Sequence, residues 1–455
     1  MAADWLPTGR VRRAATPARL IIEGAAVAAV AKAKALRGGS LEELADDARL
    51  VAAAERIARQ LGEMKGAAMK LGQVLSFVDV GLVPQQLRGA LAALQADAPP
   101  MPYDLVAQVI TAELGAPPEE LFDFFSRGPI ASASIGQVHM AHRGEDELVV
   151  KVQYPGIARA VEADLRNAAL LSMLARVTQR LLADLVGSID TRAVIDELRE
   201  RVTEELDYRI EARNQAEFAV LHRADPWLGV PEVIEELSSR RVLTSRYVDG
   251  LRWSAAKEAP QELRDRWGQA MCRFQWVSLF RDGITNLDPH PGNYLFHDDG
   301  RVTFLDFGAC QRYDADQLRR LSGLAIAAMS QDDQRMLDAL VDMGILKGLD
   351  GIDPDTMLLP MRLAIEPATT EPQPFQFTGD FVARQVGQVL RIRFGKEQLR
   401  IWRQLDAPPE LPMFLRIVLG TAGIVSQLGA AVHFQDVLDE ALDGYPGHQP
   451  YRIHP

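Results

Sequence analysis

The chain has 455 residues, 47% of them hydrophobic and 25% charged, which is typical of a globular protein with two or three substructures. Its 62 acidic and 50 basic residues give a formal net charge of −12, which argues against non-specific binding of nucleic acid. The two cysteines, Cys272 and Cys310, have no metal-ligand spacing and exclude a disulfide framework. We therefore expect a protein of a reducing compartment with no nucleic-acid partner.

Residues 1–39 form a basic and then alanine-rich N-terminal segment that begins as a secretory signal does. Glu23 interrupts its apolar run, and Lys32 and Lys34 follow, so we predict no signal peptide. An exposed helix is one interpretation, and an interfacial helix in peripheral contact with a membrane is the other. Because no run of about 20 uninterrupted apolar residues occurs, we predict no transmembrane helix and a cytoplasmic protein.

Residues 40–128 are predicted to form a helical extension. From Asp46 to Val78, apolar positions recur at steps of three and four, as on one face of a long helix. Gly72 lies within this helix, where glycine costs about 1 kcal/mol relative to alanine, so we expect another segment to approach the backbone there. A second, short helix is expected over residues 103–114.

The hydrophobic period then changes to two. Residues 136–142 and 148–154 are predicted to be antiparallel strands joined by a "GEDE" turn, and "RRVLTSRYVDG" contains a further strand. We predict an α+β protein with a small β-rich lobe over residues 129–248 and a larger helical lobe over residues 249–455.

The stretch "ITNLDPHPGNYLF", residues 284–296, contains the residues most suited to chemistry. Asp288 and Asn293 are five residues apart, and Asp306 follows in "LDFG". Protein-kinase catalytic loops use this offset, with the Asn and the DFG aspartate holding Mg²⁺ and the loop aspartate accepting a proton. Amide and carboxylate oxygens suit Mg²⁺, which binds few protein groups. The pattern predicts Asp288 as general base, with Asn293 and Asp306 as metal ligands.

Two prolines stiffen this turn. Pro289 and Pro291 fix their φ angles, so the turn is held in place before a nucleotide arrives. Each motif alone is weak, because turns of this composition also form for local hydrogen bonding. His290 is interpreted as a structural hydrogen-bonding residue in preference to a metal ligand.

A kinase-like site also needs a lysine on a strand and an acid on a helix. "VVKV" supplies Lys151, for which a solvent-facing strand lysine is the alternative. The helix predicted in "TEELDYRIEARNQAEF" offers Glu204, Glu205, Asp207 and Glu211. On an ideal helix Asp207 and Glu211 share a face and Glu205 points elsewhere, so one helix can serve two partners. A charged, solvated helix face is the alternative.

The loop that would cover the phosphates is "IASASIGQVH". The chain has no G-x-G-x-x-G and no G-x-x-x-x-G-K-[ST], so it lacks both the Rossmann and the Walker fingerprints. Small residues still let the backbone approach phosphates, but alanine tolerates positive φ less well than glycine, so we expect a stiffer loop. The predicted nucleotide-binding residues are Ala131, Ser132, Ala133, Ser134, Ile135, Gly136 and Lys151, with Arg246 and Val248 at the strand end where backbone groups normally hold adenine.

The motifs "KLGQ", "ASASIGQVH", "VVKVQYPG", "EELDYRIEARN", "LDPHPGN" and "LDFG" together resemble the UbiB/AarF family of atypical protein-kinase-like proteins. The resemblance implies a two-lobed protein-kinase-like fold with the N-terminal extension packed on the active site. It also implies binding of ATP or ADP with Mg²⁺, ATPase activity, and a role in isoprenoid quinone or membrane-lipid metabolism with a lipid or quinone-like partner.

The resemblance further implies roles for individual residues. Lys70 would meet an acidic pair from a helix that folds over the cleft, and Lys151 would pair with Glu211. The cleft-covering residues would be Lys70, Gly72, Gln73, Glu205 and Asp207. Asn286 stands where many members have a histidine, and we expect it to keep a hydrogen bond to the backbone.

The segment after DFG indicates the substrate class. Protein kinases continue with an activation segment ending in A-P-E, whereas here a helix capped by Asp314 is expected within a few residues. Leu287, not arginine, precedes Asp288. We therefore expect an ATPase or a small-molecule or lipid phosphotransferase with Asp288, Lys151 and Glu211 as catalytic residues, and not a conventional protein kinase. The alternative is a nucleotide-gated regulatory or scaffold protein with little catalysis.

Overall fold

The structure is a computed structural model that describes residues 100–133, 135–159, 206–349, 353–370, 372–392 and 410–448. These residues belong to two compact units. Unit 1 contains the described residues up to 159 together with 206–212 and 233–247. Unit 2 contains residues 213–232 and the described residues from 248 onward. The four-part division of the chain expected from the sequence stays a prediction.

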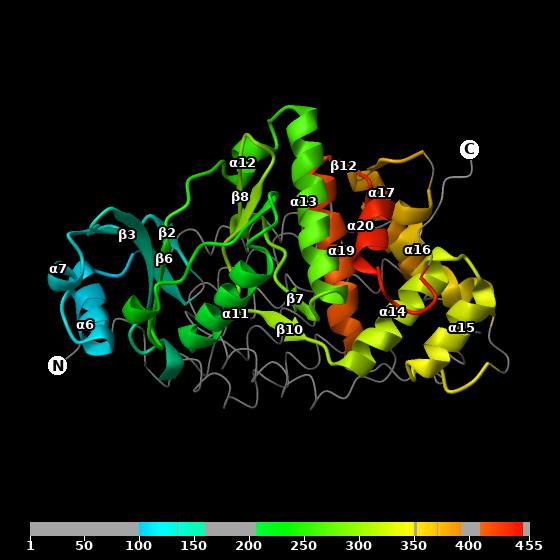
Figure 1. The fold of residues 1–455 in the computed structure, drawn as a ribbon, viewed down its shortest axis with the longest axis horizontal. Helices are drawn as coiled ribbons and strands as arrows, with labels where there is room; N and C mark the ends of the chain where they lie inside the picture. The colour runs from blue at the N-terminus through cyan, green and yellow to red at the C-terminus, as the bar shows by residue number, and fades with distance from the viewer. Residues whose placement is uncertain are drawn as a thin grey trace, which may run out of the picture. The chain divides into compact units, whose positions relative to one another are not determined.

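Unit 1 is built on a five-stranded antiparallel sheet with the strand order β1-β3-β4-β6, in which β2 also pairs with β3 (Figure 1). Its strands are β1 Phe124–Phe125, β2 Ala131–Ser132, β3 Gly136–Arg143, β4 Asp146–Gln153 and β6 Val242–Arg246. The helices of unit 1 are α6 Tyr103–Leu114, α7 Pro118–Leu121 and the 3₁₀ turn η1 Glu235–Leu237. The short helix and the strands expected from the sequence are confirmed.

The β3–β4 hairpin turns more tightly than the expected "GEDE" turn. Only Gly144 and Glu145 lie outside the strands, and Arg143 pairs with Asp146. Gly144 has φ +60°, which suits the first central position of a two-residue hairpin turn whose twist matches the strands. On β4, alternate side chains of Leu148 and Val150 are buried in the core of unit 1.

α11 (Tyr208–Leu221) begins in unit 1 and ends in unit 2. The expectation that Asp207 and Glu211 share a face of this helix was wrong, because the helix begins after Asp207. The Oδ1 of Asp207 accepts a hydrogen bond from the backbone N of Arg209 at 3.1 Å. Aspartate side chains often compete with the helix for backbone groups in this way, which favours the position just before a helix.

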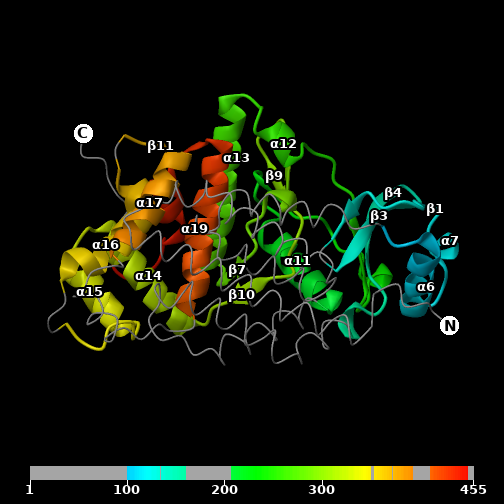
Figure 2. The same ribbon diagram turned by 180° about the vertical axis from the view of Figure 1, so that it is seen from behind.

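Unit 2 is mainly helical and has a large hydrophobic core around α13 (Gln261–Phe280). In both ribbon views α13 lies beside α19 (Figures 1 and 2), and the two helices are in contact. The other helices are α12 Trp253–Ala256, the 3₁₀ turn η2 Pro291–Asn293, α14 Ala315–Met329, α15 Asp333–Asp342, α16 Pro354–Thr369, α17 Gly379–Ile392, α19 Glu410–Leu428 and α20 Phe434–Ala441. Several α19 residues, among them Val425 and Leu428, belong to this core.

Three small sheets complete unit 2. Strands β5 Leu228–Gly229, β9 Val302–Phe304 and β8 Tyr294–Phe296 pair in that order. Strand β7 Ile284–Asn286 pairs with β10 Cys310–Arg312, and β11 Phe375–Gln376 pairs with β12 Ala431–Val432. The β8–β9 pair, in the stretch "YLFHDDGRVTF", is an antiparallel hairpin.

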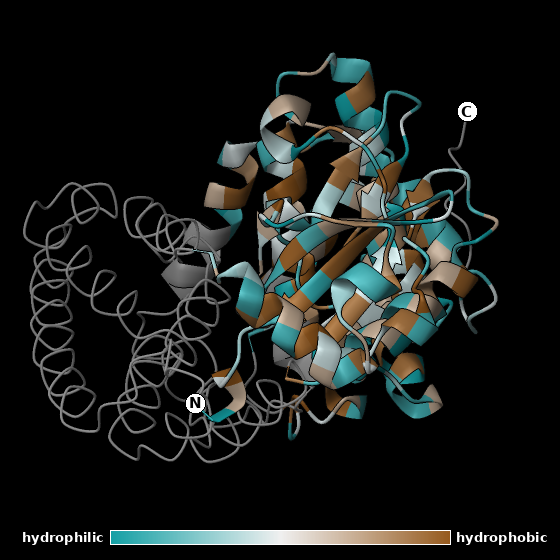
Figure 3. Ribbon diagram, turned by 90° about the vertical axis from the view of Figure 1, so that its left-hand side faces the viewer, coloured by the Kyte–Doolittle hydropathy of each residue, from teal (hydrophilic) through white to brown (hydrophobic). Residues whose placement is uncertain are grey.

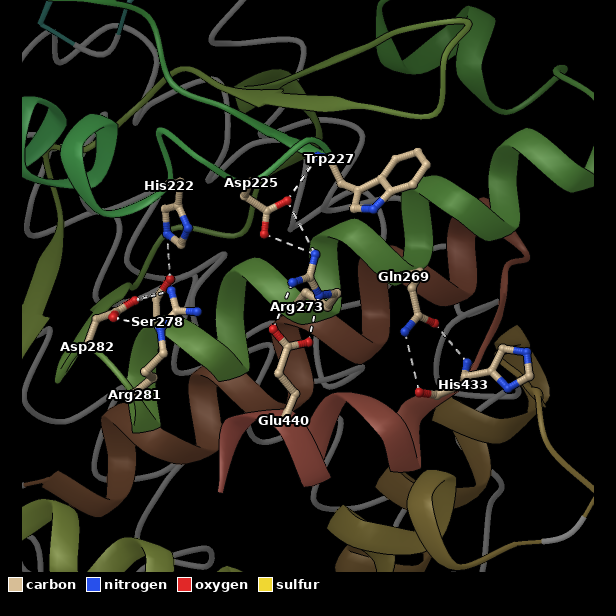
Figure 4. Close-up of polar contacts among 10 residues, drawn as sticks. All are labelled: His222, Asp225, Trp227, Gln269, Arg273, Ser278, Arg281, Asp282, His433 and Glu440. Atoms are coloured by element: carbon tan, nitrogen blue, oxygen red, sulfur yellow. Dashed lines mark hydrogen bonds and ion pairs between the residues drawn. The ribbon is translucent and has the colours of Figure 1, made fainter. Parts of the chain in front are cut away.

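A polar cluster ties α13 to neighbouring segments of unit 2 (Figure 4). Arg273 donates from Nε and Nη2 to the two carboxylate oxygens of Glu440, each at 2.8 Å, and its Nη1 lies 3.0 Å from Asp225 Oδ2. The hydrogen bond from Arg273 lowers the pKa of Glu440. The cluster joins α13 to α20 and to the segment that leads into β5.

Figure 3 shows polar and apolar residues interspersed along the strands and helices. That distribution is expected of elements that pack one side on a core. Among the residues that the structure describes, no helix combines the length and the apolar character needed to cross a membrane.

The buried His222 predicts a pH dependence of stability. It is 3% exposed, and its Nε2 lies 2.9 Å from Ser278 Oγ. Burial lowers the pKa of His222 below its ordinary value of 6.5. As pH falls below 6.5 the unfolded chain takes up the proton first, so stability should fall, by at most about 1.4 kcal/mol per pH unit for this group, and level off below the folded pKa.

Thermal melts from pH 8 to pH 5 would test this prediction. The His222→Gln variant, which can keep a hydrogen bond to Ser278, should lose stability less steeply between neutral and acidic pH. Burial also lowers the pKa of His139 and His297, so part of the slope should remain. An unchanged slope in the variant would contradict the assignment.

Candidate active site

The turn over residues 286–293, here called the catalytic turn, is held by the side chain of Asn286. Its Oδ1 accepts from the backbone N of Asp288 at 2.8 Å, and its Nδ2 donates to the backbone O of Asp306 at 2.6 Å. Asn286 is the last residue of β7, opposite Cys310 of β10, and is 8% exposed. The expected backbone hydrogen bond of Asn286 is thus confirmed, and it joins the turn to the DFG segment.

Asn293 orients Asp288 from the other end of the turn. Its Nδ2 donates to Asp288 Oδ2 at 3.0 Å and to the backbone O of Asp288 at 3.2 Å. With Nδ2 directed at Asp288, the oxygen that Asn293 can offer to a metal is Oδ1. The Asp-to-Asn offset seen in the sequence therefore closes a loop in which one side chain fixes the other.

The β8–β9 hairpin brings the two predicted metal ligands to the same end. Asn293 directly precedes β8, and its backbone O accepts from the N of Leu305, just after β9, at 3.0 Å. Asp306 is the next residue, and its Oδ1 accepts from the N of Gly308 at 2.9 Å. Residues 13 positions apart in the sequence are thereby placed at the open end of one hairpin.

His290 has the structural role expected of it. Its Nδ1 accepts from the backbone N of Gly292 at 3.1 Å, and its backbone O accepts from the N of Asn293 at 2.9 Å.

Tyr294, the first residue of β8, is 7% exposed. Burial, with a smaller contribution from the charge of Asp288, raises the pKa of Tyr294, so its hydroxyl stays protonated.

The DFG segment is anchored by Asn214, a residue whose role the sequence did not indicate. Asn214 on α11 is 4% exposed, and its Nδ2 donates to the backbone O of Phe307 at 2.9 Å. Its Oδ1 accepts from Arg312 at 3.0 Å. The Phe307 ring is fully buried, with its centroid 5.1 Å from that of Phe218. The only available signal was the position of Asn214 at the end of "EARN".

In unit 1, Lys151 and Glu211 form a close ion pair. Lys151 Nζ lies 2.8 Å and 2.9 Å from the two carboxylate oxygens of Glu211. The side chains are 19% and 6% exposed, and Nζ lies 5.0 Å from the centroid of the Tyr208 ring. The pairing implied by the resemblance is present, and it joins β4 to the first turn of α11.

The loop before β3 is a narrow turn. Ala131 and Ser132 pair with Val138 and Gln137, and Ala133 N donates to Gly136 O at 2.9 Å. A side chain at Gly136 would overlap the backbone O of Val152 and lie 2.9 Å from the hydroxyl of Tyr208. Close packing against β4 therefore requires glycine at this position.

Two further predicted residues of the loop and strand have structural contacts. Ile135 is 4% exposed in the core of unit 1, and its backbone O accepts from Tyr154 N at 2.9 Å. Arg246, at the end of β6, forms an ion pair with Asp146 on β4. Val248 begins the part of unit 2 that follows β6.

The cleft-covering set stays a prediction. The Asp207 carboxylate accepts two hydrogen bonds from the Arg209 guanidinium, at 2.9 Å and 2.6 Å. These hydrogen bonds lower the pKa of Asp207. The other members, together with one loop residue, lie outside the described residues: Lys70, Gly72, Gln73, Glu205 and Ser134.

The helix expected within a few residues of DFG is confirmed. The Asp314 side chain caps α14 by accepting hydrogen bonds from the backbone N of Asp316 at 2.9 Å and of Gln317 at 2.8 Å. In turn, the backbone N of Asp314 donates to Gln317 Oε1 at 2.9 Å. This capping box starts the helix at Ala315. The short β10 strand occupies three of the six residues between DFG and α14.

The helix α19 also contacts the catalytic turn, which sequence reasoning did not foresee. Arg416 Nη2 lies 3.5 Å from Asp288 Oδ1. A Cβ atom at Gly420 would lie 2.6 Å from Cγ of Pro289. No local pattern could have indicated these contacts, because 128 residues separate Arg416 from Asp288.

The donor set suits Mg²⁺ bound together with a nucleotide. Within the described residues, no group of three or more His, Cys, Asp or Glu side chains could hold a metal alone. Magnesium commonly binds one or two carboxylates plus substrate phosphates and waters. Asn293 and Asp306 at the end of one hairpin fit that mode better than a metal cage made of protein groups alone.

Comparisons with known proteins agree with the motifs. The profile of the ABC1 atypical kinase-like domain matches residues 93–340, so the chain belongs to this family of atypical kinase-like proteins. The mitochondrial atypical kinase COQ8B of Rattus norvegicus is 32% identical over 351 residues, which is 76% of this chain and 65% of the relative. The mitochondrial atypical kinase COQ8 of Saccharomyces cerevisiae is 29% identical over 397 residues, which is 85% of this chain and 75% of the relative.

A solved structure shows the same fold. The complex of Rv3197 with erythromycin from Mycobacterium tuberculosis has a TM-score of 0.64 and 30% sequence identity, covering 90% of this chain and 100% of that one. The kinase-like α+β fold expected from the sequence is therefore confirmed. The chain spans slightly less than two thirds of the rat relative, at 65% of its length.

Asn286 provides a test of how the catalytic turn is held. Replacing it by alanine removes the hydrogen bonds to Asp288 N and Asp306 O, so Asn286→Ala should lower the free energy of unfolding by about 1–3 kcal/mol. Urea denaturation would measure this. Asn286→His, which retains ring nitrogens for hydrogen bonding, is the control and should lose less. Equal stability of Asn286→Ala and the unmodified chain would contradict the described contacts.

Proposed function

We propose that the protein is a Mg²⁺-dependent enzyme that binds ATP and either hydrolyses it or transfers its γ-phosphoryl group to a small or lipid-like molecule. The observation that carries the proposal is the ion pair between Lys151 and Glu211, with both carboxylate oxygens within 2.9 Å of Nζ. A lysine held this way on a strand is the arrangement by which kinase-like proteins hold ATP phosphates.

Lys151 supplies positive charge to the phosphates. Because Glu211 is 6% exposed and engages Nζ with both oxygens, the lysine is restrained before a nucleotide binds. Such a preorganised charge costs little reorganisation during the reaction. In this proposal Glu211 orients Lys151 and the loop residues Ala131–Gly136 contribute backbone groups near the phosphates.

Asn293 and Asp306 bind the magnesium ion that accompanies ATP. Held by these two residues, the ion would supply positive charge that offsets the negative charge of the phosphates. Their position at one end of the β8–β9 hairpin supports this role. Asn286 keeps the DFG segment beside the turn through its hydrogen bond to the Asp306 backbone.

Asp288 accepts the proton of the attacking group. The oxygen of a water molecule or of an acceptor hydroxyl forms a bond to the γ-phosphorus, the bond from that phosphorus to the bridging oxygen breaks, and ADP leaves with its electron pair. The hydroxyl proton passes to the Asp288 carboxylate. Asn293 fixes that carboxylate by its 3.0 Å hydrogen bond to Oδ2.

A small acceptor is favoured over a protein. The six residues 309–314 separate DFG from α14, and three of them form β10, so this stretch offers no long segment on which a peptide could dock. Together with the family resemblance, this short segment supports a role for the protein in isoprenoid quinone or membrane-lipid metabolism. The acceptor in this proposal is a lipid or quinone-like molecule.

Substitution of the catalytic residues tests the activity. Asp288→Asn and Lys151→Ala should each reduce steady-state phosphate release by about 10²-fold or more, because a positioned base or charge is lost. Asp298→Asn and Lys257→Ala change exposed residues of the same types and should retain the rate. If the unmodified protein releases no phosphate above background, or if Asp288→Asn matches it, a regulatory protein that only binds nucleotide is the better description.

The substrate class can be tested separately. Lipid vesicles, detergent micelles and soluble quinone-like phenols should increase ADP formation by the unmodified protein, because an occupied acceptor site completes the reaction geometry. Asp288→Asn under the same conditions is the control for contaminating activity. A rate that does not respond to any of these additions would argue against a lipid-like acceptor while leaving ATP hydrolysis in place.

A further inference from the structure

The helix α19 contacts the catalytic turn at two positions one helical turn apart. Arg416 Nη2 lies 3.5 Å from Asp288 Oδ1, and Gly420 faces the ring of Pro289. Residues four apart lie on the same face of a helix, so a single face of α19 meets the turn. This helix follows residue 340, where the match to the family profile ends.

The contact to Asp288 is partly shielded from solvent. The side chain of Arg416 is 17% exposed and that of Asp288 is 27% exposed. Asn293 donates to Oδ2 of the same carboxylate, at 3.0 Å. The two oxygens of Asp288 are therefore engaged by different elements, Oδ2 from within the turn and Oδ1 from α19.

The contact to Pro289 leaves no space for a side chain. A Cβ atom at Gly420 would lie 2.6 Å from Cγ of Pro289, a separation that real Cβ atoms do not show. A proline ring has little freedom to turn aside because it is closed onto its own backbone. Any side chain at position 420 would therefore move the backbone next to Asp288.

Toward its C-terminal end, α19 is embedded in the core of unit 2. Ile424, Val425 and Leu428 are at most 4% exposed and belong to the main hydrophobic cluster. The helix packs against α13 and α17. A close-packed interior transmits small displacements, so the position of α19 determines where the turn can lie.

We propose that Arg416 and Gly420 are positioning residues for phosphoryl transfer, through which α19 fixes the carboxylate of Asp288. The inference rests on the proposed function, because it assigns these residues to the step in which Asp288 accepts a proton. It also means that the part of the chain beyond residue 340 is needed to complete the catalytic geometry. Neither residue is assigned any contact with the nucleotide.

The chain offers a matched pair of glycines for the test. Gly420 and Gly423 both lie in α19, but a Cβ atom at Gly423 would have no neighbour within 4 Å. Both changes to alanine favour the helix equally. Gly420→Ala should reduce kcat by about tenfold or more, since a displacement approaching 1 Å at a catalytic group can cost about 10²-fold. Gly423→Ala should retain kcat.

Arg416 is tested by the same assay with a conservative variant as the comparison. Arg416→Met should reduce kcat while the KM for ATP and the affinity for ADP stay close to those of the unmodified protein. Arg416→Lys keeps the charge but not the planar donor geometry, so it should recover part of the lost rate. A purely structural role would instead lower the melting temperature and leave kcat of the folded fraction unchanged.

A measurement that needs no catalysis separates this inference from the proposed function. Hydrogen–deuterium exchange of backbone amides over residues 286–296 should be faster in Gly420→Ala than in Gly423→Ala. Equal exchange and equal kcat in the two variants would overturn the inference, even if Asp288→Asn abolishes turnover. If exchange is faster in Gly420→Ala but the unmodified protein shows no turnover, the contact between α19 and the turn is supported. Its role in catalysis and the proposed function are then both rejected.

Discussion

Hydrogen bonds between Asp288 and the side chains of two asparagines are the constraint on which the candidate site depends. Asn286 accepts from the backbone N of Asp288, and Asn293 donates to its carboxylate. Asn286 also donates to the backbone O of Asp306, so the turn that contains Asp288 and the DFG segment are joined by one side chain. Because the prolines on either side of His290 restrict the backbone, few conformations compete with the one that these hydrogen bonds require.

The candidate site residues of unit 1 rely on a different interaction. Lys151 and Glu211 restrain each other through an ion pair that has little exposure to solvent. The sheet positions the backbone of Lys151, and α11 positions the backbone of Glu211. A restrained lysine and oxygen ligands for a metal are the groups required by a reaction that must hold and neutralise phosphate charge, with little covalent chemistry by the protein.

Much of the fold and part of the site could be predicted because their signals are local. The β3–β4 hairpin followed from an alternating apolar period, and the cap of α14 followed from Asp314 just before an apolar helix. The pairing of Lys151 with Glu211 required the family resemblance, since neither residue is informative alone. The misplacement of Asp207 on α11 arose from extending an ideal helix backwards across a residue that prefers to precede one. The contact between Gly420 and Pro289 had no local signal, because it depends on how distant helices pack.

The central claim is that Lys151, Asn293 and Asp306 act on one magnesium-bound ATP. The most direct measurement is a crystal structure of the full chain with Mg²⁺ and a non-hydrolysable ATP analogue. The account predicts a single nucleotide with Lys151 Nζ on its phosphates and one Mg²⁺ bound by Asn293 Oδ1 and Asp306. A nucleotide held by only one of these groups, or a metal bound elsewhere, would contradict it.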